Sequence, residues 1–273
     1  MSDFQALAAH VRQPREDNPI PFAEGFETRL VERLHQLGVK VLDYTINPEK
    51  YRKYIDRARY RKRYPEYYSN NFPEKSLEHF IAAELLALTA KDTYIDIASE
   101  NSPAPEIYRR LFGVTAYRQD LSYASGVHGN TIGSDAAEMP VPDGFTSKLA
   151  LHCSFEHFEG DSDVRFLRET ARVLRAGGVA CIVPLYMAET YSVMTDPRVS
   201  VPAGVQFEPD ATVHCVDGWG NRHGRFYDPE HFANRITRGL GKLSAVVYRI
   251  TNSQAVDPSC YARFALQLSM ERP

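Results

Sequence analysis

The feature that most constrains the fold is an alternation of strand and helix patterns between residues 93 and 183. Helical spacing of apolar residues appears in 105–112, which Gly113 ends, and in 164–174, which Gly177 and Gly178 end. Strands that alternate with helices in this way form a mostly parallel sheet with helices on both faces. The strand patterns are short apolar runs rich in β-branched residues, and they occupy residues 93–97, 115–118, 148–151 and 179–183.

The C-terminal part of the chain adds a different strand pairing. Two further strand patterns, residues 243–250 and 261–268, are joined by a polar loop that contains Asp257 and Pro258. Strands this close in sequence can pair directly only as an antiparallel hairpin. We therefore predict an α/β, Rossmann-like, doubly wound and mostly parallel sheet with an antiparallel C-terminal hairpin.

The first 90 residues are predicted to form a helical N-terminal cap. Residues 1–20 have little periodicity and are expected to be a loosely packed arm. Three helices follow: one over 26–37, one from the capping pair Asn47 and Pro48 to about Arg63, and one over 73–89. The predicted division is a cap of residues 1–90 and a domain of residues 91–273, in which residues 186–241 form an insertion.

The second predicted helix has an unusual composition. Between Lys50 and Arg63 there are eight basic residues and a single acid, Asp56, with Tyr51, Tyr54 and Tyr60 interleaved. One interpretation is a solvated helix face whose tyrosine rings pack on the domain. A second is a basic aromatic lid over a phosphate- or carboxylate-bearing ligand. A third interpretation, nucleic-acid binding, is the least favoured, because a single basic patch on a chain with a net negative charge is weak evidence for it.

Composition excludes several classes of protein. The net charge of −3 gives no global attraction to nucleic acid or to an anionic membrane, although a local basic patch can still act. No apolar run reaches the ~18 residues of a membrane span, and the N-terminus lacks a signal-peptide pattern. The four cysteines form no Cys-x-x-Cys pair, so we expect reduced thiols in a soluble, cytoplasmic protein.

Several motifs between Lys91 and Leu185 carry a family resemblance. Asp96 follows the apolar core of the first strand pattern, and Asp120 comes directly after the second. An Asp-Ala-x-x-Met-Pro segment begins at Asp135, inside residues 133–144. A Phe-Glu-His-Phe segment at 155–158 and a Phe-Leu-Arg-Glu-Thr-Ala-Arg-Val-Leu-Arg-Ala-Gly-Gly segment at 166–178 follow. Together these segments resemble the class I S-adenosylmethionine-dependent methyltransferases, of the methyltransferase type 11 kind.

The resemblance implies a cofactor and the residues that hold it. The cofactor is S-adenosylmethionine, and the product is S-adenosylhomocysteine. The family's loop after the first strand has three glycines, whereas this chain has Ala98, Glu100 and Ser102. This departure keeps open an alternative function, a catalytically inactive binding or scaffold protein with the same fold. The implied cofactor-binding residues are Asp96, Ala98, Ser99, Glu100, Asp120, Asp135 and Ala136.

Candidate catalytic residues follow the strand at 148–151. A general base that takes a proton from the methyl acceptor is expected there, over the carboxyl edge of the sheet. His152 and His157 are the candidates, while Glu156 is interpreted as a structural acid at a helix start. The spacing of these histidines does not favour a metal site. The resemblance implies a small-molecule or glycan-type acceptor, including an anionic one, and it leaves homo-oligomerisation open. Candidate substrate-binding residues are Tyr64, Tyr186, Tyr191 and Arg225.

Overall fold

The computed structural model describes residues 24–67 and 71–272, so the predicted arm of residues 1–20 lies outside the described part. The chain divides into two compact units. The sheet unit comprises Val41–Cys153, Phe166–Leu185 and Leu240–Pro273, and the small unit comprises Met1–Lys40, Ser154–Arg165 and Tyr186–Gly239. The predicted division into a cap of residues 1–90 and a domain of residues 91–273 with an insertion at 186–241 stays a prediction.

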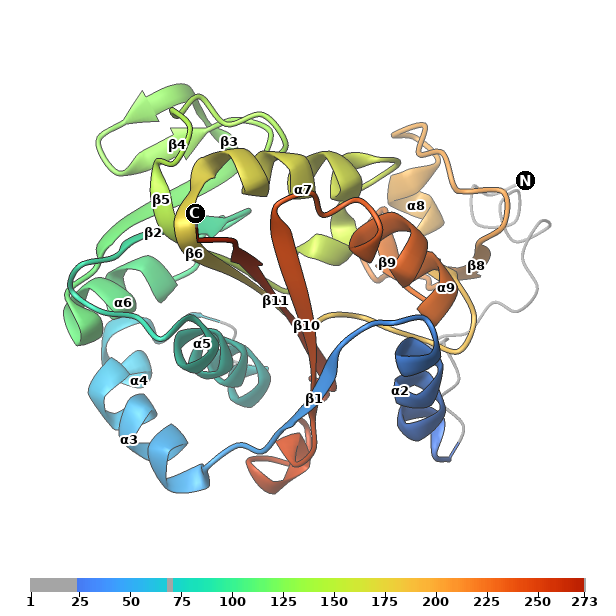
Figure 1. The fold of residues 1–273 in the computed structure, drawn as a ribbon, viewed down its shortest axis with the longest axis horizontal. Helices are drawn as coiled ribbons and strands as arrows, with labels where there is room; N and C mark the ends of the chain where they lie inside the picture. Colours follow the sequence, from blue (N-terminus) through green and yellow to red (C-terminus); the bar gives the residue numbers. More distant parts are fainter. Residues whose placement is uncertain (1–23, 68–70, 273) are drawn as a thin grey trace. The chain divides into compact units, whose positions relative to one another are not determined.

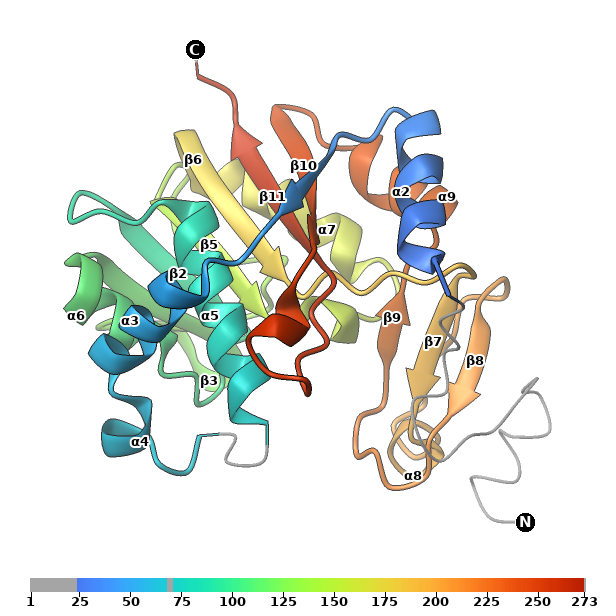
Figure 2. The ribbon, with the colours of Figure 1, turned by 90° about the horizontal axis from the view of Figure 1, so that it is seen from below.

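The sheet unit contains one eight-stranded sheet (Figures 1 and 2). Its order is β1 (Val41–Tyr44), β10 (Leu243–Ile250), β11 (Phe264–Met270), β6 (Leu174–Val183), β5 (Thr146–His152), β2 (Thr93–Ile97), β3 (Thr115–His128) and β4 (Thr131–Gly133). Strand β2 pairs in parallel with β3 and β5, and β5 pairs in parallel with β6. Strands β10 and β11 form the predicted antiparallel hairpin, which confirms the fold class.

Helices cover both faces of this sheet, because its central strands are apolar on both sides. Helices α3 (Pro48–Ala58), α5 (Phe72–Leu86) and α6 (Ala104–Phe112) lie on one face, and the part of α7 (Ser162–Val173) that belongs to the sheet unit lies on the other (Figures 1 and 2). Rings from α3 and apolar residues from α5 and α6 share one hydrophobic cluster with the sheet. Helices α3 and α5 therefore contribute side chains to the core of this unit.

The N-terminal helices follow their local signals, with one interruption. The Asn47 side chain accepts hydrogen bonds from the backbone N–H groups of Glu49 and Lys50, both at 3.0 Å, as its capping role predicts. The helix predicted through Arg63 stops at Ala58, because Arg59 adopts a left-handed φ of 55°. A short helix, α4 (Tyr60–Arg63), then begins in a new direction.

The small unit has a sheet of its own that the sequence patterns did not indicate. Its order is β8 (Thr212–Cys215), β7 (Ser192–Thr195) and β9 (Gly224–Phe226). Helix α2 (Phe26–Gln36) packs near α9 (Pro229–Phe232), where Arg33 forms an ion pair with Glu230 at 2.5 Å. The unit also contains α8 (Pro197–Ser200), a 3-10 turn at Phe155–His157 and a π turn at Ala233–Thr237, and the sheet unit has a 3-10 turn at Ser253–Ala255.

The structure bears on two expectations, the reduced state of the cysteines and the lack of a membrane span. Cys153, Cys181, Cys215 and Cys260 form no disulfide within the described part of the chain, and of the four only Cys153 is not fully buried. Within residues 24–67 and 71–272, no helix is long and apolar enough to cross a membrane.

Candidate active site

A buried carboxylate and a histidine meet at the carboxyl ends of β2 and β5. Strand β2 lies between β3 and β5. The chain continues from β2 to β3 on one side and later adds β5 on the other side of β2. The carboxyl end of β2 is therefore the topological switch point of the sheet. Ligands of open α/β sheets bind at such points. Here Oδ1 of Asp96, from β2, lies 2.9 Å from Nδ1 of His152, from β5, and both side chains are almost fully buried.

The hydrogen bonds around His152 determine which ring nitrogen carries its proton. Because a carboxylate only accepts, Nδ1 of His152 is the protonated nitrogen and Nε2 keeps a lone pair. The hydroxyl of Tyr108 lies 3.4 Å from Nε2, but it donates its own proton to the carbonyl of His79 at 2.6 Å. The Tyr108 oxygen can therefore accept from Nε2 once that nitrogen is protonated. The neighbourhood is thus suited to a histidine that receives a proton.

The tyrosine-rich helix contributes to this site from the inside. Tyr51, Tyr54 and Tyr60 are buried, so the interpretation in which the rings pack on the domain is confirmed. The Tyr60 hydroxyl lies 2.7 Å from Nδ1 of His79, whose ring centroid is 4.6 Å from that of His152. Burial, together with nearby His152 and Lys75, holds the pKa of His79 well below its ordinary value. His79 is therefore a neutral neighbour of His152.

Sequence analysis did not single out His79. The apolar stripe of the third predicted helix indicated only a packing role for that helix. In the structure, the first two turns of α5 also bury three charged residues, Glu74, Lys75 and Glu78. Burial by itself lowers the pKa of Lys75, but the Glu78 carboxylate, 2.9 Å from its Nζ, raises it above the ordinary value. The charged residues in the segment Pro-Glu-Lys-Ser-Leu-Glu-His could have indicated a polar role for this helix, because charged groups at buried helix positions require partners.

The loop after β2 keeps left-handed backbone geometry without glycine. Ala98 has a φ of 49° and Glu100 a φ of 40°, values that L-residues with a side chain rarely adopt. At the third glycine position, the Ser102 hydroxyl instead accepts a hydrogen bond from the N–H of Ala104, at the start of α6. The loop therefore follows a tight path at the two positions where a glycine would be expected.

Hydrogen bonds connect this loop to the end of β3. The carboxylate of Asp120 accepts from the backbone N–H of Glu100 at 2.9 Å. The side chain of Gln119, which is 1% exposed, accepts from the N–H of Ala98 at 3.1 Å and donates to the carbonyl of Ser134 at 2.5 Å. The structure thus brings Ala98, Glu100 and Asp120 together and holds them to the residue before Asp135.

Two residues of this edge were missed by sequence analysis. Gln119 connects the loop to Ser134, and Tyr123 donates its hydroxyl to the carbonyl of Glu100 and lies 3.1 Å from the Ser99 hydroxyl. Both belong to β3, which was predicted to end at residue 118 but continues to His128. Asp135 itself forms a turn in which Oδ1 accepts from the N–H of Ala137 at 2.9 Å, and Ala136 is buried.

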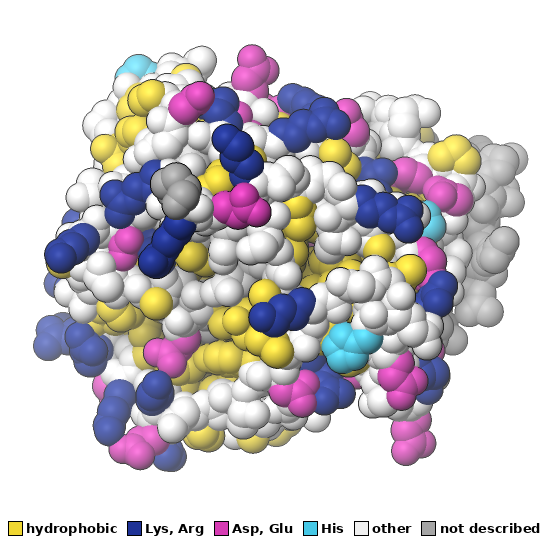
Figure 3. All heavy atoms as spheres, in the orientation of Figure 1, with side chains coloured by type: hydrophobic (Ala, Val, Ile, Leu, Met, Phe, Trp, Pro, Cys, Tyr) yellow, Lys and Arg dark blue, Asp and Glu magenta, His cyan; other side chains and the backbone are white. Residues whose placement is uncertain are grey.

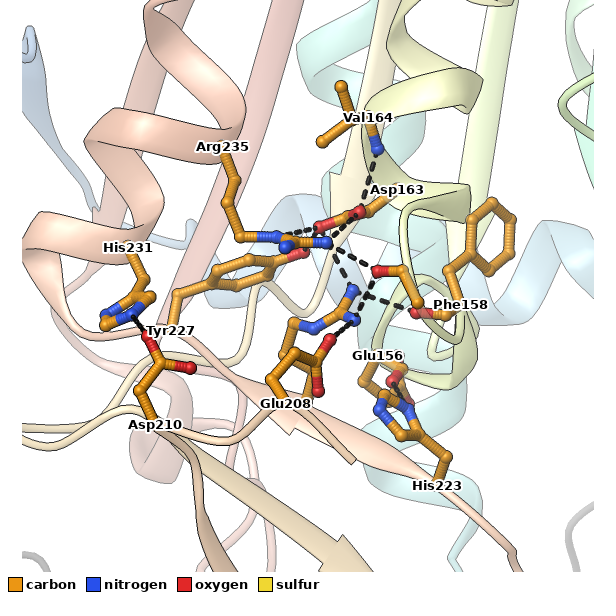
Figure 4. Close-up of polar contacts among 12 residues, drawn as sticks. Glu156, Phe158, Asp163, Val164, Glu208, Asp210, His223, Tyr227, His231 and Arg235 are labelled. Carbon is orange, nitrogen blue, oxygen red and sulfur yellow. Dashed lines mark hydrogen bonds and ion pairs between the residues drawn. The ribbon is translucent and has the colours of Figure 1, made fainter. Parts of the chain in front are cut away.

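In the small unit, the predicted substrate-binding residue Arg225 lies in a buried ionic network. Asp163, Glu208 and Arg235 of this network are labelled in Figure 4. Its guanidinium donates to the carbonyls of Phe158 at 2.8 Å and Gly160 at 2.9 Å, and it pairs with Asp163 at 3.0 Å and with Glu208. Three of its five N–H donors are therefore in hydrogen bonds and the ion pair with Asp163 adds a fourth contact, while the Nε atom has no hydrogen-bond partner among the described residues.

The three predicted tyrosines lie in different surroundings. Tyr191 is buried, stacks on His231 with centroids 3.9 Å apart, and has a hydroxyl without a hydrogen-bond partner in the described chain. Burial raises the pKa of Tyr191 to about 12. Tyr186 is half-buried against Phe226, with ring centroids 5.0 Å apart. Tyr64, in the sheet unit, donates its hydroxyl to Glu106 at 2.9 Å.

The second candidate base, His157, belongs to the small unit. Its Nδ1 donates to the carbonyl of His223 at 2.5 Å, and its Nε2 lies 3.6 Å from Glu156, beyond hydrogen-bond distance. It therefore lacks the buried carboxylate that orients His152. Among residues 24–67 and 71–272, no cluster of three or more His, Cys, Asp or Glu side chains has the geometry to hold a metal ion.

Comparison with known proteins gives one family-model match and a set of similar folds. Residues 82–182 match the family model described as a methyltransferase domain. The 1,6-didemethyltoxoflavin-N1-methyltransferase of Burkholderia thailandensis, solved with 1,6-didemethyltoxoflavin and S-adenosylhomocysteine, is similar over 85% of this chain and 94% of its own, with 11% identity and a TM-score of 0.50. The geranyl diphosphate C-methyltransferase of Streptomyces coelicolor A3(2) is similar over 100% and 99%, with 11% identity and a TM-score of 0.42. No curated protein sequence matches.

Proposed function

We propose that the protein transfers a methyl group from S-adenosylmethionine to a small-molecule or glycan-type acceptor, because residues 82–182 match a methyltransferase-domain model and the sheet is similar to that of a solved methyltransferase. The observation that carries this proposal is the edge formed by the loop 98–102 and Asp120. When bound, the cofactor supplies an electrophilic methyl group on its sulfonium. The residues of this chain have to bind it, orient the acceptor and accept a proton.

The backbone of the loop 98–102 fits such a cofactor despite its missing glycines. The left-handed φ values of Ala98 and Glu100 preserve the sharp turn that a glycine loop makes, and backbone geometry decides how closely a ligand can approach. Buried Asp96 also keeps one oxygen, Oδ2, that has no hydrogen-bond partner among the described residues. A buried carboxylate oxygen without a hydrogen-bond partner, at the switch point of the sheet, suits a cationic group or an N–H donor of a ligand.

Asp120 retains capacity for a hydroxyl donor. A carboxylate has about four lone-pair positions. Oδ1 accepts from the N–H and the hydroxyl of Ser122, at 2.8 and 2.7 Å, and Oδ2 accepts from the N–H of Glu100. One position on Oδ2 therefore remains for a ribose hydroxyl. The next residue, Leu121, is 77% exposed and offers an apolar surface beside this carboxylate, as a nucleoside ring requires.

We assign His152 as the general base and Asp96 as the residue that positions it. Asp96 fixes the proton on Nδ1, so Nε2 is free to take a proton from an oxygen or nitrogen acceptor. The resulting imidazolium is stabilised by the Asp96 charge on one side and by the Tyr108 oxygen on the other. His157 remains the second candidate.

For the acceptor, the small unit offers two partly unsatisfied side chains. The Tyr191 hydroxyl and the Nε–H of Arg225 are buried polar groups without hydrogen-bond partners in the described chain, and such groups favour a polar ligand or ordered water. We propose that they contact polar groups of the acceptor. Tyr186 and Tyr64 remain further candidates.

The experiment that tests the cofactor assignment is calorimetric titration of the full chain with S-adenosylmethionine and S-adenosylhomocysteine. We expect micromolar binding, and we expect Asp120→Ala to weaken it at least tenfold, because the ribose acceptor is lost. His152→Gln is the matched control and should bind the cofactor as the parent chain does. No binding up to about 1 mM, where the binding free energy is only about −4 kcal/mol, would favour the inactive binding-protein alternative instead.

A further inference from the structure

The surface of α3 and α4 carries a dense set of basic side chains. We call it the basic face, and it consists of Arg52, Lys53, Arg57, Arg59, Arg61, Lys62 and Arg63, all of them exposed. Lys and Arg side chains gather over these two helices in the space-filling view (Figure 3). The bend at Arg59 directs the side chains of the two helices to different parts of the same surface.

Most of the charge on this face is not neutralised by the protein. Lys53 pairs with Glu49 at 2.6 Å, but Arg52, Arg59, Arg61 and Lys62 form no ion pair within the described chain. The carbonyl groups at the end of α3 accept from Arg110, at 2.6 and 2.7 Å, which adds a further positive charge behind the face. A surface of like charges has a positive potential that attracts polyanions.

The inner side of the two helices excludes a small ligand. The rings of Tyr51, Tyr54 and Tyr60 point into the hydrophobic cluster of the sheet unit and fill the space beneath the basic face. The arginines are exposed while these rings are buried, so the two do not face a ligand together, as the lid interpretation requires. Since the buried rings cannot stack on bases, single-stranded nucleic acid lacks its usual platform on this surface.

We propose that the basic face binds the surface of a bilayer that contains anionic phospholipids, by electrostatic attraction and without insertion. A fluid bilayer lets each flexible basic side chain find a headgroup phosphate independently, whereas a rigid duplex requires phosphates in a fixed register. The large exposed hydrophobic residues of the described chain all lie outside residues 48–63, so insertion is not expected. With a net charge of −3, the chain as a whole is repelled, which leaves this face as the contact.

The experiment measures partition of the full chain onto vesicles by cosedimentation. The vesicles contain phosphatidylcholine with or without about one quarter phosphatidylglycerol, at ~0.05 and ~0.5 M NaCl. The test variant carries Arg52→Gln, Arg59→Gln, Arg61→Gln and Lys62→Gln. The control variant carries Lys40→Gln, Arg168→Gln, Arg238→Gln and Lys242→Gln, which removes the same charge from other exposed positions.

The parent chain and the control variant should bind only the anionic vesicles, and high salt should release them. Each basic residue near an anionic surface contributes a factor of about five to the partition coefficient, so the test variant, which lacks four of them, should lose about 600-fold. Equal losses in the two variants, or binding to pure phosphatidylcholine, would overturn the proposal. Tighter binding to a duplex RNA or DNA of about 20 base pairs, at equal phosphate concentration, would assign the face to nucleic acid instead. Circular dichroism and thermal melting show whether each variant is folded.

Discussion

The buried guanidinium of Arg225 gives the most direct test of the small unit. Arg225→Met keeps the length of the side chain and removes its charge. Arg235 remains to neutralise Asp163, which it contacts at 2.6 and 2.9 Å, and Tyr227 still donates to that carboxylate at 2.6 Å. The carbonyl of Gly160 also keeps Arg235 as a donor, at 2.6 Å. The losses are therefore concentrated on Phe158 and Glu208.

The magnitude follows from those losses. Removing a donor from a buried carbonyl costs about 1–3 kcal/mol, which applies to Phe158. Glu208, whose side chain is 16% exposed, loses its ion pair but can be partly hydrated, so its contribution is about 1 kcal/mol. Weaker neutralisation of Asp163 adds about 1 kcal/mol. We expect Arg225→Met to destabilise the small unit by about 3–5 kcal/mol.

Urea unfolding followed by tryptophan fluorescence measures this effect, because the single tryptophan, Trp219, belongs to the small unit. The matched control is Arg222→Met, which breaks an exposed ion pair with Glu159 and should cost less than about 1 kcal/mol. A loss below about 1 kcal/mol for Arg225→Met would refute the reasoning, since it would mean that the network contributes nothing net. Far-ultraviolet circular dichroism of the same samples follows the remainder of the chain.

Two further predictions concern the loop and the acid–base behaviour of the small unit. Glu100→Gly relieves a left-handed conformation at a φ of 40°, so it should leave stability unchanged or raise it by up to about 1 kcal/mol, whereas Glu100→Ala should not; thermal melting of both variants decides this. Burial lowers the pKa of His231, but its contacts with Asp210 at 2.9 Å and Asp228 at 2.8 Å raise it above the ordinary value on balance. A histidine whose pKa is raised in the folded state stabilises the fold. That stabilisation is fully present below the unfolded-state pKa of about 6.5, and it is lost as the pH rises through the folded-state pKa. The difference in melting temperature between the parent chain and His231→Gln should therefore shrink from pH 5.5 to pH 8.5, and an unchanged difference would contradict the assignment.

Much of the sheet unit followed from local patterns. Strand β2 and helix α6 have nearly the predicted bounds, and the hairpin β10–β11 pairs as expected. These elements are short, periodic and bounded by Gly, Pro or Asn, so sequence-local signals decide them. Strand β1 was missed because four residues carry too little pattern, and it forms only through parallel pairing with β10, about 200 residues later in the chain.

The order of the strands and helices between residues 93 and 183 follows from the sequence alone, and with it the edge at which Asp96, Asp120 and His152 would gather, because residue periodicity and strand ends are local properties. Only the tertiary structure decided that Asp96 orients His152, that His79 lies beside it, and that the tyrosines of α3 face inward while its arginines face solvent. Hydrogen bonds between distant segments and the burial of one helix face depend on how the elements pack, and a linear pattern does not encode those distances. The same packing determined that four groups of the same unit contact the guanidinium of Arg225, which residue type alone does not reveal.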